Sequence, residues 1–214
     1  MKYHLPYNYS IRKNNASYTD EIGPFNYQPH VYALADQIAS RAGLEWIIDI
    51  GCGSAGKLVP FSDKNFSIIG VDTKDGIRLA RDAIPNATLI AHDLGKGAPR
   101  FPDNILPKAL IICSDVIEHV RKPQRLIHDL AKLSRKVPFL LVSTPDRDRA
   151  RGWLDNGPPI NPAHIMEWSG SEFIRFMVDC GFDKTPFYGH TINTDFHRTK
   201  STTLALSGTH ANIT

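Results

Sequence analysis

Short apolar runs alternate with longer mixed segments along the chain and predict a parallel β-sheet covered by helices. The runs lie at residues 46–50, 67–71, 87–91, 109–113 and 137–143. Polar residues do not alternate within them, which is typical of strands that are buried on both faces. Two further strands are predicted near residues 184–190 and 201–207. The pattern therefore indicates an α/β fold.

Helix signals lie between these runs. One helix is predicted from Pro29 to just before Gly43, and others near residues 75–84 and 123–134. Ser169 and Glu172 form a capping box, which predicts a further helix ending near Gly181. Residues 92–108 are rich in Gly and Pro, so no full helix is expected there, and residues 145–168 are expected to form a long loop. We predict an irregular arm or cap over residues 1–28 and a single domain over residues 29–214.

A glycine-rich turn follows the first strand and should open a helix. Gly51, Gly53 and Gly56 satisfy the GxGxxG pattern of dinucleotide-binding turns. Asp72 ends the next strand, where a carboxylate suits the ribose hydroxyls of an adenosine ligand. These residues alone do not distinguish NAD from other adenosine compounds.

Asp49 favours a cationic ligand. It stands two residues before the first glycine, where a carboxylate would repel a pyrophosphate at the helix N-terminus. S-adenosylmethionine has no phosphate and carries an ammonium and a sulfonium group, so an acid beside it is favourable. Asp93 closes the third strand and suits the amino group of adenine. We therefore predict S-adenosylmethionine as the cofactor. An NAD-type oxidoreductase and a catalytically silent module of the same fold are the rival interpretations.

The motifs IIDIGCGSAGKL, GVDTKD, AHDL and CSDVIEHV together resemble the class I S-adenosylmethionine-dependent methyltransferases in order and spacing, over about residues 45–207. The resemblance implies a Rossmann-like seven-stranded sheet of order 3-2-1-4-5-7-6, with strand 7 antiparallel and helices on both faces. It also implies that Asp49, Gly51, Gly53 and Ser114 contact the methionine part, Asp72 the ribose, and Asp93 and Leu94 the adenine. Cys52 and Thr73 complete the predicted cofactor-binding set.

An acidic and histidine-bearing cluster follows the fourth strand. If Asp115, Glu118 and His119 begin a helix, they lie on one helix face at the carboxyl edge of the sheet. The run DVIEHV resembles that of quinone-biosynthesis O-methyltransferases. Small-RNA 2′-O-methyltransferases place a metal on a similar ExxEH set with a further histidine, for which His164 is the candidate here. We favour the interpretation without a divalent metal, in which Glu118 and His119 hydrogen-bond to each other or to the backbone.

The segment from residue 158 to 168 carries the candidate general base. His164 has a pKa range suited to accepting a hydroxyl proton, and Glu167 is near enough in sequence to orient it. His119 and Asp115 are the alternative bases. In the rival interpretation, His164 and Trp168 only pack the loop onto the body. Two further expectations concern Arg147, Arg149 and Arg151, interpreted as a solvated rim, and Tyr18 and Tyr27, interpreted as caps over the site.

Composition adds weak constraints. The formal net charge of +3 and the isoelectric point near 8.7 do not give the single-sign field that would indicate a nucleic-acid partner, so none is expected, and the apolar runs are too short for a membrane span. Three cysteines far apart in sequence favour a reduced, cytoplasmic protein.

The predicted function is S-adenosylmethionine-dependent O-methylation of a small hydroxylated acceptor. The segment 143–169 resembles bacterial methyltransferases met near glycan and natural-product genes, which makes a sugar or natural product the first acceptor class. A metal-assisted RNA 2′-O-methyltransferase is the alternative within the enzyme interpretation. A homodimer is left open.

Overall fold

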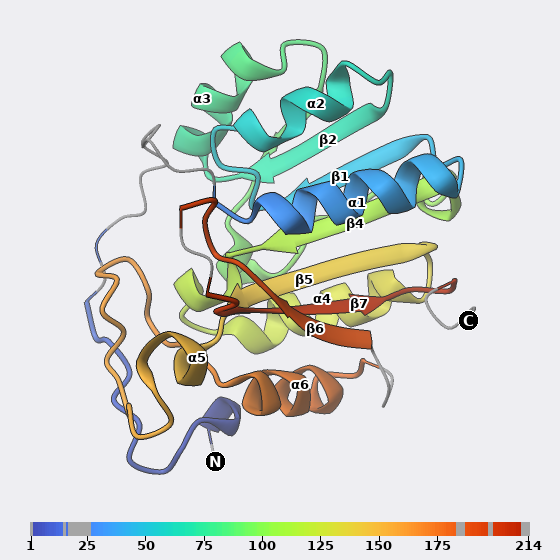
Figure 1. The fold of residues 1–214 in the computed structure, drawn as a ribbon. Coiled ribbons are helices and arrows are strands. Elements are labelled where there is room, and N and C mark those ends of the chain that lie inside the picture. Colours follow the sequence, from blue (N-terminus) through green and yellow to red (C-terminus); the bar gives the residue numbers. More distant parts are fainter. Residues whose placement is uncertain (1, 15, 17–26, 183–186, 197–198, 211–214) are drawn as a thin grey trace.

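The computed structural model describes residues 2–14, 16, 27–182, 187–196 and 199–210. Its centre is a seven-stranded sheet of order β3-β2-β1-β4-β5-β7-β6, as the sequence predicts (Figure 1). Five parallel strands come first: β1 (Trp46–Ile50), β2 (Ser67–Asp72), β3 (Thr88–Ala91), β4 (Ala109–Ser114) and β5 (Phe139–Pro145). Strands β6 (Phe187–Thr191) and β7 (Thr202–Ser207) complete the sheet, and β7 is antiparallel to both of its neighbours.

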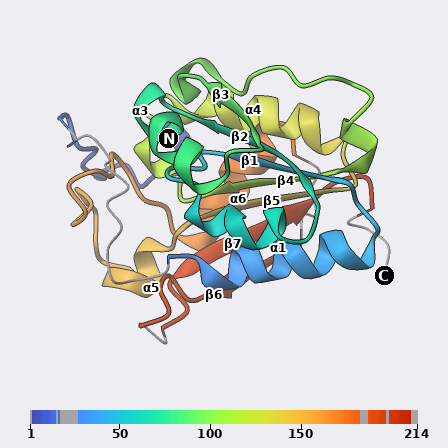
Figure 2. The same ribbon diagram turned by 90° about the horizontal axis from the view of Figure 1, so that it is seen from above.

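Helices cover both faces of the sheet. They are α1 (Pro29–Arg41), α2 (Val59–Ser62), α3 (Lys74–Ala83), α4 (Pro123–Ser134), α5 (Arg147–Arg151) and α6 (Gly170–Asp179). Alternate residues of each strand point to opposite faces, so Ile47 packs with α1 to α3, whereas Ile48 packs with α4 and α6. Figure 2 shows α1 and α4 on opposite sides of the sheet.

The structure contains the predicted helices and strands, with local differences in their bounds. The glycine turn leads to a 3₁₀ turn (Gly56–Leu58) and the one-turn helix α2, rather than to a long helix. Strand β5 begins two residues later than predicted, after Pro138, which has no N–H to donate to a ladder. Only 3₁₀ turns follow β3 in the segment 92–108, as expected. The predicted start of the strand near 184 falls on residues 183–186, which lie outside the described ranges.

The long loop after β5 contains a short helix that the sequence pattern did not indicate. Helix α5 begins because the Asp146 side chain accepts a hydrogen bond from the backbone N–H of Arg149. Among the residues that the structure describes, no helix has both the length and the apolar character needed to cross a bilayer.

The capping box at the start of α6 is present as predicted. Ser169 Oγ accepts from the N–H of Glu172, and a Glu172 carboxylate oxygen accepts from the N–H of Ser169. This helix carries Phe176, whose ring stacks at 5.6 Å on buried Trp168. The cap therefore anchors the end of the loop that carries the candidate base.

We predict that Ser169→Ala lowers the free energy of unfolding by about 1 kcal/mol, because a buried N–H at the helix start loses its acceptor. Urea unfolding measures the change. Ser40→Ala, at an exposed serine inside α1, is the control and should stay within about 0.5 kcal/mol of the unmodified protein. Equal effects of the two changes would contradict the capping role.

Candidate active site

The glycine turn has the geometry that its sequence requires. Gly51 and Gly53 have φ angles of 91° and 54°, which glycine adopts readily and other residues rarely do. A Cβ atom at Gly51 would overlap the side chain of Val116, which follows β4. The turn after β1 and the segment after β4 are therefore in direct contact.

Asp72 is tied to this turn at the edge of the sheet. One carboxylate oxygen accepts from the N–H of Gly53 at 2.8 Å, and the other accepts from the N–H of Thr73 at 2.6 Å. Thr73 also caps α3, because its Oγ1 accepts from the N–H of Gly76. Cys52 is buried within the turn. Thr73 Oγ1 also donates to Asp72 at 3.0 Å, and a carboxylate can accept about four hydrogen bonds, so capacity for a ribose hydroxyl remains and the ribose role of Asp72 stays a prediction.

Asp49 is buried at the end of β1. Its carboxylate accepts a hydrogen bond from Tyr32 Oη at 2.9 Å, and its Oδ1 atom has no partner among the described residues. Burial raises the pKa of Asp49 to about 7, against the opposing effect of the positive charge on Lys57. Tyr32 was missed from the sequence, because a tyrosine within an apolar helix face gives no sign of what its hydroxyl contacts.

Asp93 and Leu94 lie apart from these residues. Asp93 is exposed, caps a 3₁₀ turn through the N–H of Gly95, and lies 3.7 Å from the ammonium of Lys96. Leu94 is half-buried and packs against the core. Neither residue lines the pocket that the glycine turn forms, so their contact with adenine stays a prediction.

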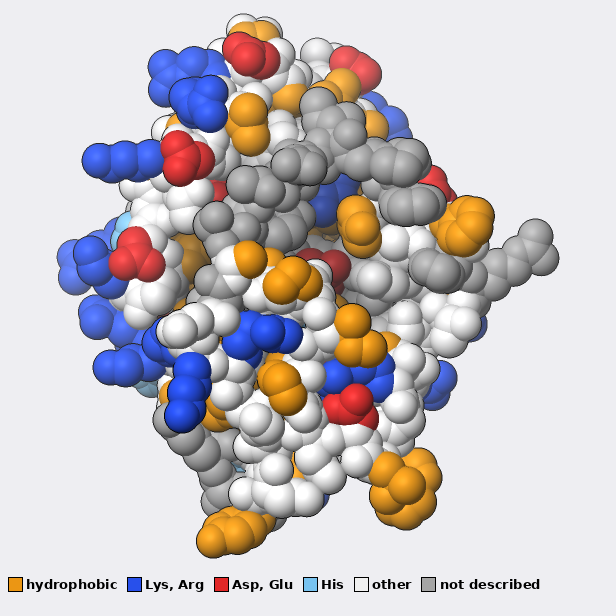
Figure 3. Space-filling model, turned by 90° about the vertical axis from the view of Figure 1, so that its left-hand side faces the viewer, with side chains coloured by type: hydrophobic (Ala, Val, Ile, Leu, Met, Phe, Trp, Pro, Cys, Tyr) orange, Lys and Arg blue, Asp and Glu red, His pale blue; other side chains and the backbone are white. Residues whose placement is uncertain are grey.

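A small pocket opens where β1, β4 and β5 end. It encloses about 70 Å³, which is room for reacting groups but not for a whole nucleoside. Its lining residues are Tyr27, Gly51, Cys52, Gly53, Lys57, Ser114, Asp115, His119, Pro145, Asn161, His164 and Asn193. Figure 3 looks onto this edge of the sheet and shows acidic side-chain atoms within a hollow near the middle of the face. Seven of the predicted site residues thus meet in one pocket.

The segment after β4 does not form the predicted helix. Ser114 ends the strand with its Oγ 2.7 Å from Ser143 Oγ. Asp115 then takes a left-handed φ of 54°, and only a 3₁₀ turn (Ile117–His119) follows. The expectation that Asp115, Glu118 and His119 share one helix face is therefore wrong. Asp115 instead accepts a hydrogen bond from Gln28 Nε2 at 2.7 Å.

Glu118, His119 and His164 form a compact group. One ligand atom from each lies within 4.8 Å of the other two, and the imidazole rings meet edge to face at 4.7 Å between centroids. The Glu118 carboxylate accepts from Thr144 Oγ1 at 3.0 Å, and its other oxygen is buried without a partner among the described residues. The first acid of the predicted set, Asp115, lines the same pocket but is not part of this group.

Both imidazole rings are oriented through Nδ1. His119 Nδ1 donates to the backbone carbonyl of Ala163 at 3.1 Å, and His164 Nδ1 donates to Glu167 at 2.6 Å. The contact between His164 and Glu167 confirms the orienting partner predicted from the sequence. Nε2 of His164 keeps its lone pair, which accepts from the Asn161 side chain at 3.0 Å.

Burial controls the protonation of this group. It raises the pKa of Glu118 well above its usual range, and the nearby charge of Asp115 adds to this effect. Burial also raises the pKa of Asp115. It lowers the pKa of His119 to about 4, to which the charge of His164 contributes. His119 is thus a neutral imidazole at physiological pH, a state that can accept a proton or bind a metal.

Two of the three arginines after β5 are not solvated, so that expectation is wrong for them. Arg147 is buried and donates to both carboxylate oxygens of Glu172. Arg151 lies 2.9 Å from Glu167, on the side away from His164. Of the two predicted caps, Tyr27 lines the pocket and Tyr18 lies outside the described residues.

Comparison with known proteins decides the family. A family model described as a methyltransferase domain matches residues 27–186. The chain belongs to this family. The resemblance to class I S-adenosylmethionine-dependent methyltransferases noted from the sequence is thereby confirmed, and the matched region contains the whole pocket except Asn193.

The match to curated relatives spans only part of the length of each relative. The "Probable S-adenosylmethionine-dependent methyltransferase" of Mycobacterium tuberculosis is 26% identical over 68% of this chain and 52% of the relative. The ubiquinone biosynthesis O-methyltransferase of Cupriavidus pinatubonensis is 27% identical over 68% of this chain and 54% of the relative. The chain therefore spans about half the length of these relatives.

Solved structures agree in fold. The methyltransferase domain of a bacterial Hen1, named CtHen1, superimposes with a TM-score of 0.61 and 19% identity, over 85% of this chain and 98% of that one. Magnesium protoporphyrin IX methyltransferase from Synechocystis, solved with bound SAH, has a TM-score of 0.55 and 17% identity, over 84% and 82%.

We predict that the affinity of the chain for S-adenosylmethionine rises about tenfold from pH 6 to pH 8. Asp49 has a pKa of about 7 and gains its negative charge over this range, and the charge attracts the cationic methionine part. Calorimetric titration at each pH measures the change. Asp49→Asn should bind S-adenosylmethionine more weakly, with little dependence of the affinity on pH. The same pH dependence in this variant as in the unmodified protein would contradict the role of the Asp49 charge.

Proposed function

We propose that the chain catalyses O-methylation of a hydroxyl group by S-adenosylmethionine, assisted by a divalent cation held by Glu118, His119 and His164. The observation that carries this proposal is the compact group of one buried carboxylate and two imidazoles, because both imidazoles line the same pocket as the glycine turn. The relative from Cupriavidus, an O-methyltransferase by name, supports oxygen as the acceptor atom.

The residues present fit such an ion. A buried Glu118 oxygen lacks a partner among the described residues, so a cation would satisfy it. Each ring donates its Nδ1–H to an oxygen acceptor, which is the usual support for histidines that bind metal through Nε2, and at His164 a cation would replace the Asn161 amide as the partner of Nε2. These supports lead us to revise the sequence-based preference for a site without metal. A mixed imidazole and carboxylate set suits Mn²⁺, Fe²⁺ or Zn²⁺ better than Mg²⁺.

The cation, when bound, would act as a Lewis acid that lowers the pKa of the acceptor hydroxyl. The chain itself positions the reactants. The turn at Gly51 and Gly53 holds the methionine part of the cofactor, and the enclosed pocket brings the acceptor oxygen in line with the methyl group. The S–CH₃ bond breaks as the O–CH₃ bond forms, which yields neutral S-adenosylhomocysteine and the methyl ether.

The hydroxyl proton needs an acceptor, and Asp115 is our choice. It lines the pocket, and its Oδ1 atom is buried without a partner among the described residues. Burial raises its pKa, which makes it a stronger base than an exposed aspartate. His164, the first general base predicted from the sequence, and His119, an alternative base, are instead assigned as ligands of the cation.

A sugar or a hydroxylated natural product is the first acceptor class, as the sequence resemblance suggests. The small pocket supports this choice, because it admits one hydroxyl-bearing edge of an acceptor rather than a whole ring system.

We predict that the protein binds one Mn²⁺ per chain and that methylation falls at least tenfold after chelation and returns with Mn²⁺. Glu118→Gln should abolish Mn²⁺ binding and keep S-adenosylhomocysteine binding, because it removes an anionic ligand without changing volume. Calorimetry and a tritiated methyl-transfer assay on hydroxylated acceptors measure both effects.

Glu45→Gln, at an exposed residue paired with Lys108, is the control and should change neither property. Methylation that survives chelation, in a protein that binds no Mn²⁺, would exclude the cation. A loss of turnover in His164→Ala under those conditions would instead identify His164 as the base.

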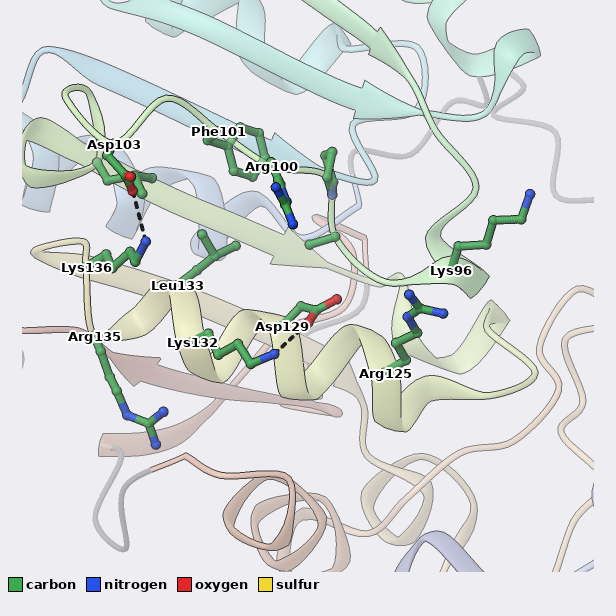
Figure 4. Close-up of a pocket in the computed structure, with 13 residues that line it drawn as sticks. Lys96, Arg100, Phe101, Asp103, Arg125, Asp129, Lys132, Leu133, Arg135 and Lys136 are labelled. Carbon is green, nitrogen blue, oxygen red and sulfur yellow. Dashed lines mark hydrogen bonds and ion pairs between the residues drawn. The ribbon is translucent and has the colours of Figure 1, made fainter.

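A second candidate acceptor is a ribose hydroxyl of RNA, favoured by a basic groove on the α4 side of the sheet. The groove holds about 750 Å³ and lies beside the helix-free segment that follows β3. Its charged lining consists of Lys96, Arg100, Asp103, Arg125, Asp129, Lys132, Arg135 and Lys136 (Figure 4). Cations outnumber acids in this lining, which suits a phosphate backbone.

The groove gives a test that separates the two acceptor classes. Asp103 and Asp129 are paired with Lys136 and Lys132, whereas no ion pair of Arg100 or Arg125 is found among the described residues. If RNA is the acceptor, the double change Arg100→Glu and Arg125→Glu should lower RNA methylation at least tenfold and weaken its salt dependence. If a small sugar is the acceptor, methylation of the sugar should be unchanged in this variant.

A further inference from the structure

The N-terminal segment 2–14 runs along the loop that carries His164. Figures 1 and 2 both show the two segments side by side, although more than 140 residues separate them in the sequence. Backbone hydrogen bonds join them: the N–H of Ser10 donates to Asn156 O at 2.7 Å, and the N–H of Arg12 donates to Ile165 O at 2.9 Å. Segment 2–14, called the arm below, is thus hydrogen-bonded to the loop at residues 156 and 165, which flank His164 in the sequence.

Arg12 holds this loop with its side chain as well. Its Nε donates to the backbone carbonyl of His164 at 3.0 Å, and its Nη2 donates to the carbonyl of Pro159. The planar guanidinium therefore joins two carbonyls that lie five residues apart on the same loop. This contact fixes the backbone from which the His164 imidazole projects.

Tyr9 acts on the partner of His164. Its hydroxyl oxygen accepts from the N–H of Glu167 at 2.9 Å, and the Arg147 guanidinium lies 5.4 Å from its ring centroid. The Glu167 carboxylate in turn accepts from His164 Nδ1 and pairs with Arg151 on its other side. A continuous series of contacts therefore connects the arm to the imidazole.

We propose that Arg12 and Tyr9 are positioning residues for the His164 side of the cation site. The reason is that His164 stands on an irregular segment, where neither a helix nor a strand sets the direction of its side chain. The arm supplies the missing hydrogen bonds. This inference rests on the proposed function, because it assigns His164 to the cation.

The first test is Mn²⁺ affinity, measured by calorimetry on the full chain. Arg12→Ala should weaken Mn²⁺ binding about tenfold, within the range found for residues that orient metal ligands, and should leave S-adenosylhomocysteine affinity unchanged. Arg12→Lys retains a cationic donor and should recover part of the loss. Tyr9→Phe should give a smaller loss, because only the acceptor for one N–H is removed.

Arg41→Ala removes an exposed arginine at the end of α1 and is the control, with no expected change in either affinity. If the unmodified protein binds Mn²⁺ and Arg12→Ala binds it equally well, the positioning role is overturned while the proposed function stands.

If the unmodified protein binds no Mn²⁺, hydrogen exchange still tests whether the arm orders the loop, separately from the claim that the site holds a cation. That result removes the cation from the proposed function. Exchange of the Glu167 amide should still rise at least tenfold in Tyr9→Phe, and exchange around residues 163–167 should rise in Arg12→Ala, because these amides lose their ordering contacts. Unchanged exchange would overturn the inference that the arm orders this loop.

Discussion

The contact between Gly51 and Val116 is the constraint on which the active site depends. Strands β1 and β4 are adjacent and parallel, so the chain leaves both at the same edge of the sheet. The residue that follows each strand has a positive φ angle; it is Gly51 after β1 and Asp115 after β4. Val116 then fills the space that a side chain at position 51 would need. The cofactor turn and the segment that carries Glu118 and His119 are consequently packed together, and a group bound by one lies against the other.

Much of this arrangement is readable from the sequence, because local patterns specify it. Apolar runs without alternating polar residues indicate the strands, and the glycine turn with its flanking acids indicates the edge of the sheet where we propose that the cofactor binds. The spacing of His164 and Glu167 places both on one short segment, where they meet as predicted. The positions of Asp115, Glu118 and His119 relative to one another could not be predicted in this way. A helix and a single 3₁₀ turn are alternatives after a strand, and the left-handed φ at Asp115 decides between them.

The surroundings of the site could not be predicted, because they depend on contacts between distant segments. An arginine-rich stretch after a strand ordinarily faces solvent. Here Arg147 and Arg151 are instead covered, since the carboxylates of Glu172 and Glu167 lie behind them. The N-terminal segment 2–14 likewise shows no periodicity, and hydrogen bonds to the loop after β5 hold it in place. Composition alone does not reveal such pairing, because the acid and the base belong to different elements.

The electrostatics of the pocket link its two halves. Burial raises the pKa of Asp49 beside the cofactor turn, and it does the same for Asp115 and Glu118 beside the candidate cation site. Lys57 opposes the shift at both Asp49 and Asp115, so one ammonium stabilises carboxylates of both halves. Buried carboxylates are stable in the charged form only when cations neutralise them. A positively charged methyl donor and a divalent ion each supply such a charge, and the neutral product sulfide does not. In the proposed reaction the donor loses its positive charge while Asp115 takes up the hydroxyl proton, so the loss of one neutralising charge is matched by the loss of one carboxylate charge, and the buried acids stay balanced through the methyl transfer.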